Sequence, residues 1–204
     1  MCLPQDRREA FFSQPPQSSE FTEALDHLIG ELGSVMSKLT PEMAETLIKE
    51  LESAPRIFGY GGGRSGYILR GFCMRLMHLG FEVFFVGETI TPRLQPQDLL
   101  LVMSGSGETA HTVDMVRRAN GAGARTLALT AQPHSSIGRT AQVVLAVPGT
   151  TKLTLAQEPA SVQCPGSLFE QATFLFLETV VLILFKHRLN QDQDQILSRH
   201  TDLE

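Results

Sequence analysis

Residues 104–109 read Ser-Gly-Ser-Gly-Glu-Thr and follow five apolar residues, Leu99 to Met103. The apolar run predicts a short strand buried on both faces, and apolar residues at helical spacing in 110–119 predict a helix directly after the loop. Such a loop offers unused backbone N–H groups, the positive end of a helix dipole and three hydroxyls, which together suit a phosphate monoester. Its candidate binding residues are Ser104, Gly105, Ser106, Gly107, Glu108 and Thr109.

An alternative interpretation of this loop is an ordinary strand-to-helix turn in which Ser106 caps the helix. Three hydroxyls and two glycines within six residues exceed what a cap requires. Gly105 and Gly107 would let the backbone approach an anion without an intervening Cβ. No Gly-Lys-Ser/Thr follows, so the loop is not a Walker loop. We therefore favour phosphate binding.

Residues 61–66, Gly-Gly-Gly-Arg-Ser-Gly, form a second glycine-rich turn after a strand predicted over 56–60. Loops at the carboxyl ends of parallel strands share one edge of the sheet, where open α/β folds bind ligands. Ser65 could bond a sugar hydroxyl there and Arg64 could supply positive charge, although a plain helix cap explains Ser65 equally well. As a dinucleotide fingerprint the turn is weak, because Glu88 is only a loose candidate for the ribose-binding acid.

Strand and helix patterns alternate five times along the chain, which predicts an α/β fold. We expect a three-layer αβα sandwich around a five-stranded parallel sheet of the flavodoxin-like kind. Extra helices are predicted at both ends of the chain, over 20–38 and 41–53 before the first strand and over 167–189 and 192–199 after the last. The strands are predicted over 56–60, 81–86, 98–103, 125–130 and 142–147.

A length of 204 residues fits one domain, which we place at 20–204 after a Pro- and Gln-containing mobile arm at 1–19. The net charge of −5 gives no electrostatic footprint for nucleic acid. The apolar stretch 174–185 is too short to span a membrane and contains Glu178. Three cysteines without metal spacing suggest a reducing, cytoplasmic setting, and no histidine has ligand spacing, so no metal site is expected.

Several segments together carry a resemblance to a known family. They are Gly-Arg-Ser-Gly-Tyr (63–67), Met-Arg-Leu-Met-His-Leu-Gly (74–80), Val-Gly-Glu-Thr (86–89), the loop 104–109, Gly-Ser-Leu-Phe-Glu-Gln (166–171) and Arg-His-Thr-Asp-Leu-Glu (199–204). From about residue 20 to the C-terminus the chain resembles the SIS (sugar isomerase) domain and, within it, the 6-phospho-3-hexuloisomerase family. The resemblance implies interconversion of D-arabino-3-hexulose 6-phosphate and fructose 6-phosphate in the ribulose monophosphate pathway. It also implies proton transfer through a C2–C3 enediol, without metal or organic cofactor.

The resemblance also assigns roles to residues of this chain. Ser104, Ser106 and Thr109 would hold the phosphate, Ser65 would touch the sugar and Glu170 would be the general base. The residue pattern alone instead favours a capping box over 167–170, with the acid at its fourth position.

His200 has two interpretations as well. In a polar tail a histidine is ordinarily an exposed side chain, whereas the resemblance assigns this tail to the active-site region, in its own or a neighbouring subunit. There His200 would open the sugar ring or shuttle a proton.

Two other functions stay open: an isomerase of a pentose or heptose phosphate, and a non-catalytic SIS sensor of sugar phosphates. The acid at Glu170 favours turnover, and the arm before residue 20 is too short and not basic enough for a DNA-binding module. The apolar helix patterns in 20–53 and 174–185 exceed what one five-stranded sheet can cover. We therefore expect a homo-oligomer, a tetramer built as a dimer of dimers.

Overall fold

A five-stranded parallel sheet forms the centre of the computed structural model, which describes residues 18–151 and 161–202. Its order is β2-β1-β3-β4-β5, so the predicted flavodoxin-like sheet is confirmed. The direction of strand progression reverses between β1 and β3, which creates a crevice at their carboxyl ends. The strands are β1 (Ile57–Gly61), β2 (Val83–Phe85), β3 (Leu99–Met103), β4 (Arg125–Thr130) and β5 (Val143–Ala146).

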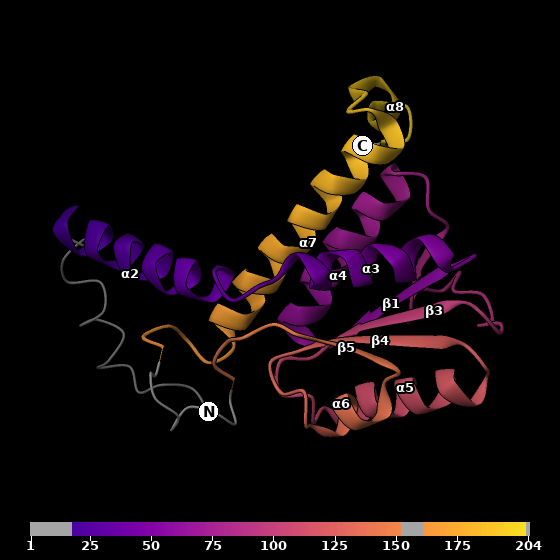
Figure 1. The fold of residues 1–204 in the computed structure, drawn as a ribbon, viewed down its shortest axis with the longest axis horizontal. Helices are drawn as coiled ribbons and strands as arrows, with labels where there is room; N and C mark the ends of the chain where they lie inside the picture. Colours follow the sequence, from indigo (N-terminus) through magenta and orange to yellow (C-terminus); the bar gives the residue numbers. More distant parts are fainter. Residues whose placement is uncertain (1–17, 152–160, 203–204) are drawn as a thin grey trace, which may run out of the picture.

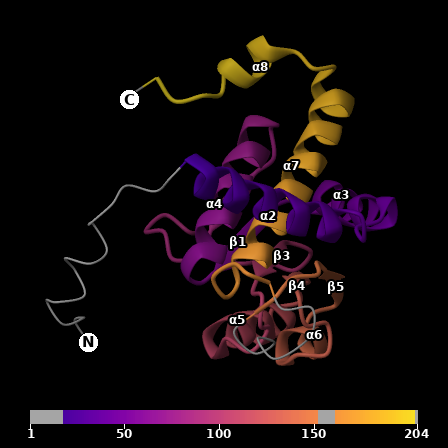
Figure 2. The same ribbon diagram turned by 90° about the vertical axis from the view of Figure 1, so that its left-hand side faces the viewer.

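Helices cover both faces of the sheet, which confirms the predicted three-layer sandwich (Figures 1 and 2). One face carries α3 (Pro41–Ser53), α4 (Gly63–His78) and α7 (Ser167–Leu189). The other carries α5 (Ala110–Gly121) and α6 (Ser136–Thr140). The remaining helices, α2 (Ser18–Met36) and α8 (Gln193–Leu197), lie outside these layers: α2 projects from the domain past the start of α7, and α8 follows its far end.

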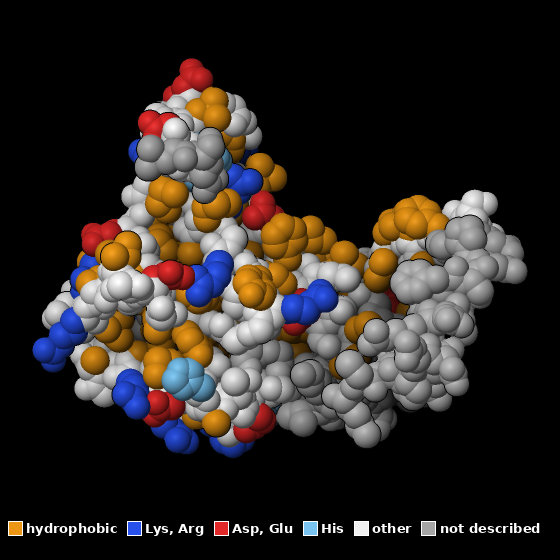
Figure 3. Space-filling view, turned by 180° about the vertical axis from the view of Figure 1, so that it is seen from behind, with side chains coloured by type: hydrophobic (Ala, Val, Ile, Leu, Met, Phe, Trp, Pro, Cys, Tyr) orange, Lys and Arg blue, Asp and Glu red, His pale blue; other side chains and the backbone are white. Residues whose placement is uncertain are grey.

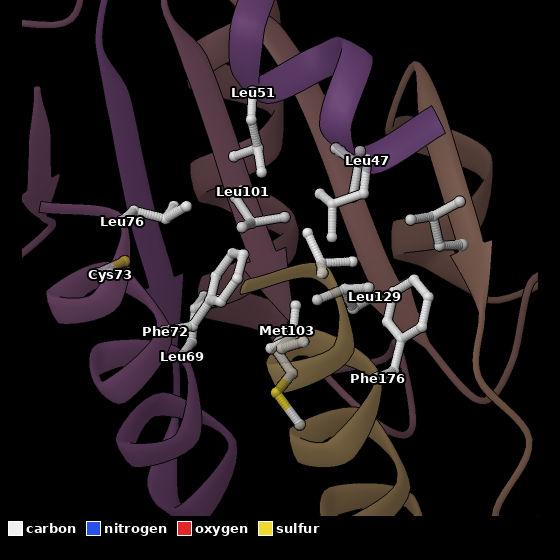
Figure 4. Packing of buried hydrophobic residues seen from close by; sticks show 14 of the residues in the cluster. Leu47, Leu51, Leu69, Phe72, Cys73, Leu76, Leu101, Met103, Leu129 and Phe176 are labelled. Carbon is white, nitrogen blue, oxygen red and sulfur yellow. The ribbon is translucent and has the colours of Figure 1, made fainter. Parts of the chain in front are cut away.

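The central strand β3 joins two hydrophobic clusters because all five of its residues are buried. Successive side chains of a strand point to opposite faces of the sheet. Leu101 and Met103 accordingly pack with α3, α4 and α7, as Figure 4 shows, whereas Leu100 and Val102 pack with α5. The core therefore fixes the register of the strand that leads into loop 104–109.

Helix α7 is the longest element and runs from the sheet edge to α8. By length and composition it could cross a membrane, but core helices of globular proteins pass the same test. Phe169, Phe176 and Leu177 are buried in the cluster that α7 shares with α3 and α4. Helix α7 thus serves here as a core helix, although its 23 residues extend well beyond the apolar stretch 174–185 that the sequence indicated was too short for a span.

The structure shifts several predicted boundaries. Helix α4 begins at Gly63, so Arg64 and Ser65 belong to its first turn and not to a loop before it. A Cβ at position 66 would overlap the carbonyl oxygen of Gly61. Because Gly66 has no Cβ, α4 can start this early and approach β1 closely. Residues 18–19, assigned to the arm from the sequence, are helical in α2. The rest of the arm lies outside the described residues.

Candidate active site

The two glycine-rich turns meet in a cavity of about 320 Å³ at the carboxyl ends of β1 and β3. Residues 62–65 form one wall and residues 103–106 with Thr109 form another. A third wall comes from Thr151 and from the start of α7, namely residues 165–166, Phe169 and Glu170. The first turns of α4, α5 and α7 therefore converge here, and each brings the positive end of a helix dipole.

The hydroxyls of loop 104–109 are placed to meet a ligand. Ser104 is buried, and its Oγ lies 3.3 Å from Thr109 Oγ1. Thr109 is the N-cap residue of α5, yet its side chain makes no capping hydrogen bond. Ser106 is not the cap, so that interpretation was wrong; its Oγ accepts a 3.3 Å hydrogen bond from Glu108 N within the loop. The geometry suits an oxyanion.

The two glycines of the loop have different structural reasons. A Cβ on Gly105 would lie 2.9 Å from Phe169 Cδ1, so Gly105 lets α7 close against the loop. Gly107 has φ of +64°, and a Cβ there would overlap the Ser135 hydroxyl. Its carbonyl accepts a 3.0 Å hydrogen bond from Ile137 N. Gly107 does not line the cavity, so it shapes the loop and is not placed to touch a ligand there.

Glu108 was predicted to bind substrate, but the structure directs its side chain away from the cavity. Its two carboxylate oxygens accept hydrogen bonds of 2.8 Å from Ser136 N and 2.6 Å from Ser136 Oγ. Both bonds lower the pKa of Glu108, and the bond from the Ser136 hydroxyl has the larger effect. The carboxylate of Glu108 therefore binds the first residue of α6 and not a ligand in the cavity.

Glu170 and Arg64 face each other across the cavity. Arg64 Nε lies 2.6 Å from Glu170 Oε2, and the side chains are 67% and 13% exposed respectively. The carboxylate is thus mostly enclosed while its partner reaches solvent. Because an exposed guanidinium can change rotamer at little cost, this ion pair can open when an anionic ligand enters.

The capping-box interpretation of Glu170 was wrong. The N-cap residue of α7 is Gly166, which has no side chain to cap with and adopts φ of +92°. Ser167, the expected cap, is the first helical residue, and its N–H donates to Cys164 O at 3.0 Å. The helix begins at Ser167, as predicted, but a capping box would need Ser167 to be the residue before the helix. The carboxylate of Glu170 is therefore free to pair with Arg64.

Within one chain, His200 lies far from this cavity. It follows α8, at the end of α7 opposite to Glu170 (Figures 1 and 2). Glu170 and Leu189 are separated by roughly 28 Å along the helix, at about 1.5 Å per residue. The His200 ring stacks on His78, with centroids 5.2 Å apart. The structure thus brings together Arg64, Ser65, Ser104–Ser106, Thr109 and Glu170, but not His200.

Thr151 and Phe169 are among the residues of the cavity wall that sequence reasoning did not identify as candidates. Thr151 is buried and follows β5 at the same sheet edge, so its place after a strand was an available signal. Lys152, the next residue and a positive charge after the same strand, lies outside the described residues. Within 18–151 and 161–202, no group of three His, Cys, Asp or Glu side chains could hold a metal ion. A metal-independent reaction stays a prediction.

Comparison with known proteins agrees with this geometry. The SIS domain family matches residues 50–162. A 3-hexulose-6-phosphate isomerase of Bacillus subtilis is 36% identical over 90% of this chain and 98% of its own length. The enzyme of the same name from Mycobacterium gastri is 37% identical over 91% of this chain and 92% of its own. A regulator of the helix-turn-helix type from Haemophilus influenzae is 33% identical, but over 50% of this chain and 37% of its own length.

Solved structures agree as well. A crystal structure from Methanococcus jannaschii, from which a function of 3-hexulose-6-phosphate isomerase was inferred, has a TM-score of 0.76 and 32% identity. It covers 89% of this chain and 99% of that one. A phosphoheptose isomerase from Francisella tularensis has a TM-score of 0.64 and covers 84% of this chain and 100% of that one, but at 15% identity it supports the fold alone. The chain belongs to the SIS domain family and, within it, to the relatives of the 3-hexulose-6-phosphate isomerases.

Proposed function

We propose that this chain is a sugar-phosphate isomerase that interconverts D-arabino-3-hexulose 6-phosphate and fructose 6-phosphate, a step of the ribulose monophosphate pathway. One observation carries the proposal: a largely enclosed carboxylate, Glu170, lines the same cavity as the three hydroxyl residues of the loop, Ser104, Ser106 and Thr109. An anion cradle beside a carboxylate is what a proton transfer on a phosphorylated sugar requires. The relatives named 3-hexulose-6-phosphate isomerase support the choice of substrate.

In this proposal the phosphate group lies against Ser104, Ser106 and Thr109. Their hydroxyls donate hydrogen bonds to it, and the amides at the start of α5 with its helix dipole supply positive potential. Because the chain carries a net charge of −5, this local field has to offset the overall charge of the molecule. Ser65, in the first turn of α4, then lies within the same cavity to meet a sugar hydroxyl.

The chemical step moves one proton between adjacent carbons. Glu170 takes the proton from C2 of the 3-hexulose, and the C2–H electron pair forms the C2=C3 double bond as the C3 oxygen gains a proton. The enediol then loses the proton of its C2 hydroxyl to solvent, which also supplied the proton on the C3 oxygen, and Glu170 returns a proton to C3. A C2 ketone results, with no net oxidation. A single carboxylate is sufficient as the shared base.

Arg64 acts both before substrate binds and during the proton transfer in this proposal. Before substrate binds it neutralises Glu170, and the substrate anion provides a competing partner for its exposed guanidinium. The carboxylate is then released at the moment when it is needed as a base. Arg64 in turn can stabilise the negative charge that develops on the enediol oxygens.

Purified protein supplied with 3-hexulose 6-phosphate should form fructose 6-phosphate, detected by a coupled dehydrogenase. Arabinose 5-phosphate and sedoheptulose 7-phosphate, tested in parallel, should be turned over much more slowly. A preference for either of those sugars would reassign the substrate. Tight binding of a sugar phosphate without turnover would favour the sensor function that the partial similarity to a regulator suggests.

The tetramer expected from the sequence also remains our proposal. Large apolar side chains are exposed on α2, including Phe21 at 68% and Ile29 at 61%, and on α7, including Leu182 at 60%. Figure 3 shows apolar side chains along the concave side of the molecule between the end of α7 and α2. A surface of this kind ordinarily marks a protein interface.

Light scattering should therefore give a mass of about four times the 22.4 kDa of one chain. Ile29→Glu should lower that mass, because a charge cannot be buried unpaired at an apolar interface. Glu23→Gln, at an exposed position of the same helix, is the matched control and should leave the mass unchanged. A wild-type monomer at micromolar concentration would contradict the assembly.

A further inference from the structure

Glu31 of helix α2 makes polar contacts with the segment that precedes the site. Ser161 Oγ donates to Glu31 Oε2 at 2.6 Å, and Gln163 Nε2 donates to the same oxygen at 2.8 Å. Val162 N donates to Oε1 at 2.8 Å. Both carboxylate oxygens are therefore occupied by one segment about 130 residues further along the chain. Charge-assisted bonds of this kind are stronger than neutral ones.

The segment that Glu31 holds leads directly into the third wall of the cavity. Residues 161–163 are followed by Cys164 and then by Pro165 and Gly166, which line the cavity and lead into α7. Glu170 lies one turn later, and among the described residues its carboxylate is held by the ion pair with Arg64. The position of this carboxylate therefore depends on where the turn lies.

Two details indicate that the segment would not hold its conformation without the carboxylate. The Ser161 hydroxyl, besides donating to Glu31, accepts a 3.1 Å hydrogen bond from Gln163 N, so the turn is closed around the group that Glu31 binds. The Gln163 side chain points its amide nitrogen to Glu31 and leaves Oε1 buried without a partner in the described part of the chain. An unpaired buried oxygen is unfavourable, so its carboxylate contact has to offset that loss.

The electrostatics of Glu31 agree with a permanent contact. Burial acts to raise its pKa, but the hydrogen bonds from Ser161, Val162 and Gln163, with the nearby His27, outweigh burial and lower the pKa. The group is therefore ionised near neutral pH, in the state that accepts all three hydrogen bonds.

We propose that Glu31 is a positioning residue of the active site: by holding residues 161–163 it fixes the start of α7 and hence the carboxylate of Glu170. This rests on the proposed function of Glu170 as the base. Loop 104–109 and Ser65 belong to other elements, so substrate binding does not depend on Glu31 in the same way. Displacement by about 1 Å can cost up to roughly 10²-fold in rate, so the effect falls on turnover.

Glu31→Ala tests this proposal against two comparison variants. It should lower kcat about tenfold or more and leave KM within about twofold of wild type. Glu31→Gln should restore part of kcat: its oxygen can still accept from Val162 N and its amide can donate to the Ser161 hydroxyl, but the amide cannot accept from Gln163 Nε2. Glu23→Ala, on the same helix and contacting His27 at 3.8 Å, should behave as wild type. Far-UV circular dichroism establishes that each variant is folded.

Hydrogen exchange gives a second measurement that needs no turnover. Peptides covering residues 161–166 should exchange faster in Glu31→Ala than in wild type or Glu23→Ala, because Val162 N loses its acceptor. Unchanged exchange, a wild-type kcat in Glu31→Ala, or an equal loss of kcat in Glu23→Ala would each overturn the proposal. If wild-type protein converts no sugar phosphate, the proposed function fails, and exchange still decides whether Glu31 holds this segment.

Discussion

Glu170→Gln should lower kcat by about 10²–10⁴-fold, the range usually attributed to a positioned base. Glutamine preserves the length and volume of the side chain, but its amide cannot accept a carbon-bound proton. KM should stay near the wild-type value, because the loop that holds the phosphate is unchanged. A loss confined to kcat identifies a group that acts in the transition state.

The fold should tolerate this substitution. Glu170 does not cap α7, and the ion pair that it loses has an Arg64 side chain 67% exposed to solvent. Such exposed pairs contribute roughly 0–1 kcal/mol to stability. The melting temperature of Glu170→Gln should therefore shift by no more than a few degrees, so lost activity cannot be ascribed to unfolding.

Two controls separate the base from its ion pair. Glu178→Gln removes a half-buried carboxylate two turns further along α7, in a different cavity, and should retain wild-type kcat. Arg64→Gln breaks the same ion pair from the other side but keeps the carboxylate. It should raise KM, because it removes a positive charge from the site, and it should lower kcat less than Glu170→Gln does, because the base is still present. Full activity in Glu170→Gln would assign the catalytic proton transfer to another group.

Isotope exchange tests the same step without a variant. In deuterated water the wild-type enzyme should leave deuterium on the sugar carbon that receives the proton, because a carboxylate base exchanges its proton with solvent. Glu170 is 13% exposed, so it is not sealed from water. A product entirely free of label would contradict a solvent-exchanging base and favour a hydride shift.

The sequence predicted the architecture well because short-range residue patterns indicate each strand of the sheet. Buried on both faces, β3 is a continuous apolar run, and glycine-rich turns mark the strand ends. Boundaries were less accurate where long-range contacts decide them. Helix α4 starts within the predicted turn 61–66, because Gly66 packs on Gly61 across the strand-to-helix turn.

The residues of the candidate site also differ in whether local patterns or long-range contacts determine them. Hydroxyls at a strand end could be identified because the topology alone carries them to the ligand-binding edge. The side-chain direction of Glu108 could not be predicted, because it depends on Ser136, 28 residues later. The role of Glu31 was also hidden, since its partners at 161–163 lie about 130 residues away and no local pattern links them.

His200 is a further residue whose role could not be predicted from local patterns, because its neighbours would depend on how the subunits of the proposed tetramer assemble. Its tail was associated with the active site by family resemblance, yet in one chain it stacks on His78 at the distal end of α4. Burial is the largest of the effects that lower the pKa of His78, with His200 and Arg75 adding to it. A catalytic role for His200 would therefore require another subunit to bring it near a cavity of this kind, as in the proposed tetramer.

Ser104→Ala combined with Thr109→Ala should raise KM by roughly 10–100-fold, since a hydrogen bond to a charged group contributes about 1.5–3 kcal/mol. The hydroxyls lie 3.3 Å apart and are each other's partner, so their effects should not simply add. Removing both together also avoids a buried hydroxyl without a partner, which would destabilise the loop for reasons unrelated to ligand binding.

The readout for this double variant can be directed at the phosphate end of the substrate. Inorganic phosphate should inhibit the wild-type enzyme competitively, and its inhibition constant should rise in parallel with KM in the variant. Ser136→Ala is the matched control: its hydroxyl bonds Glu108 outside the cavity, so KM and phosphate inhibition should stay at wild-type values. The amides and dipole at the start of α5 remain in the double variant, which is why binding should weaken and not vanish. An unchanged KM together with unchanged phosphate inhibition would remove Ser104 and Thr109 from the binding site and leave the phosphate to the first turns of α4 and α7.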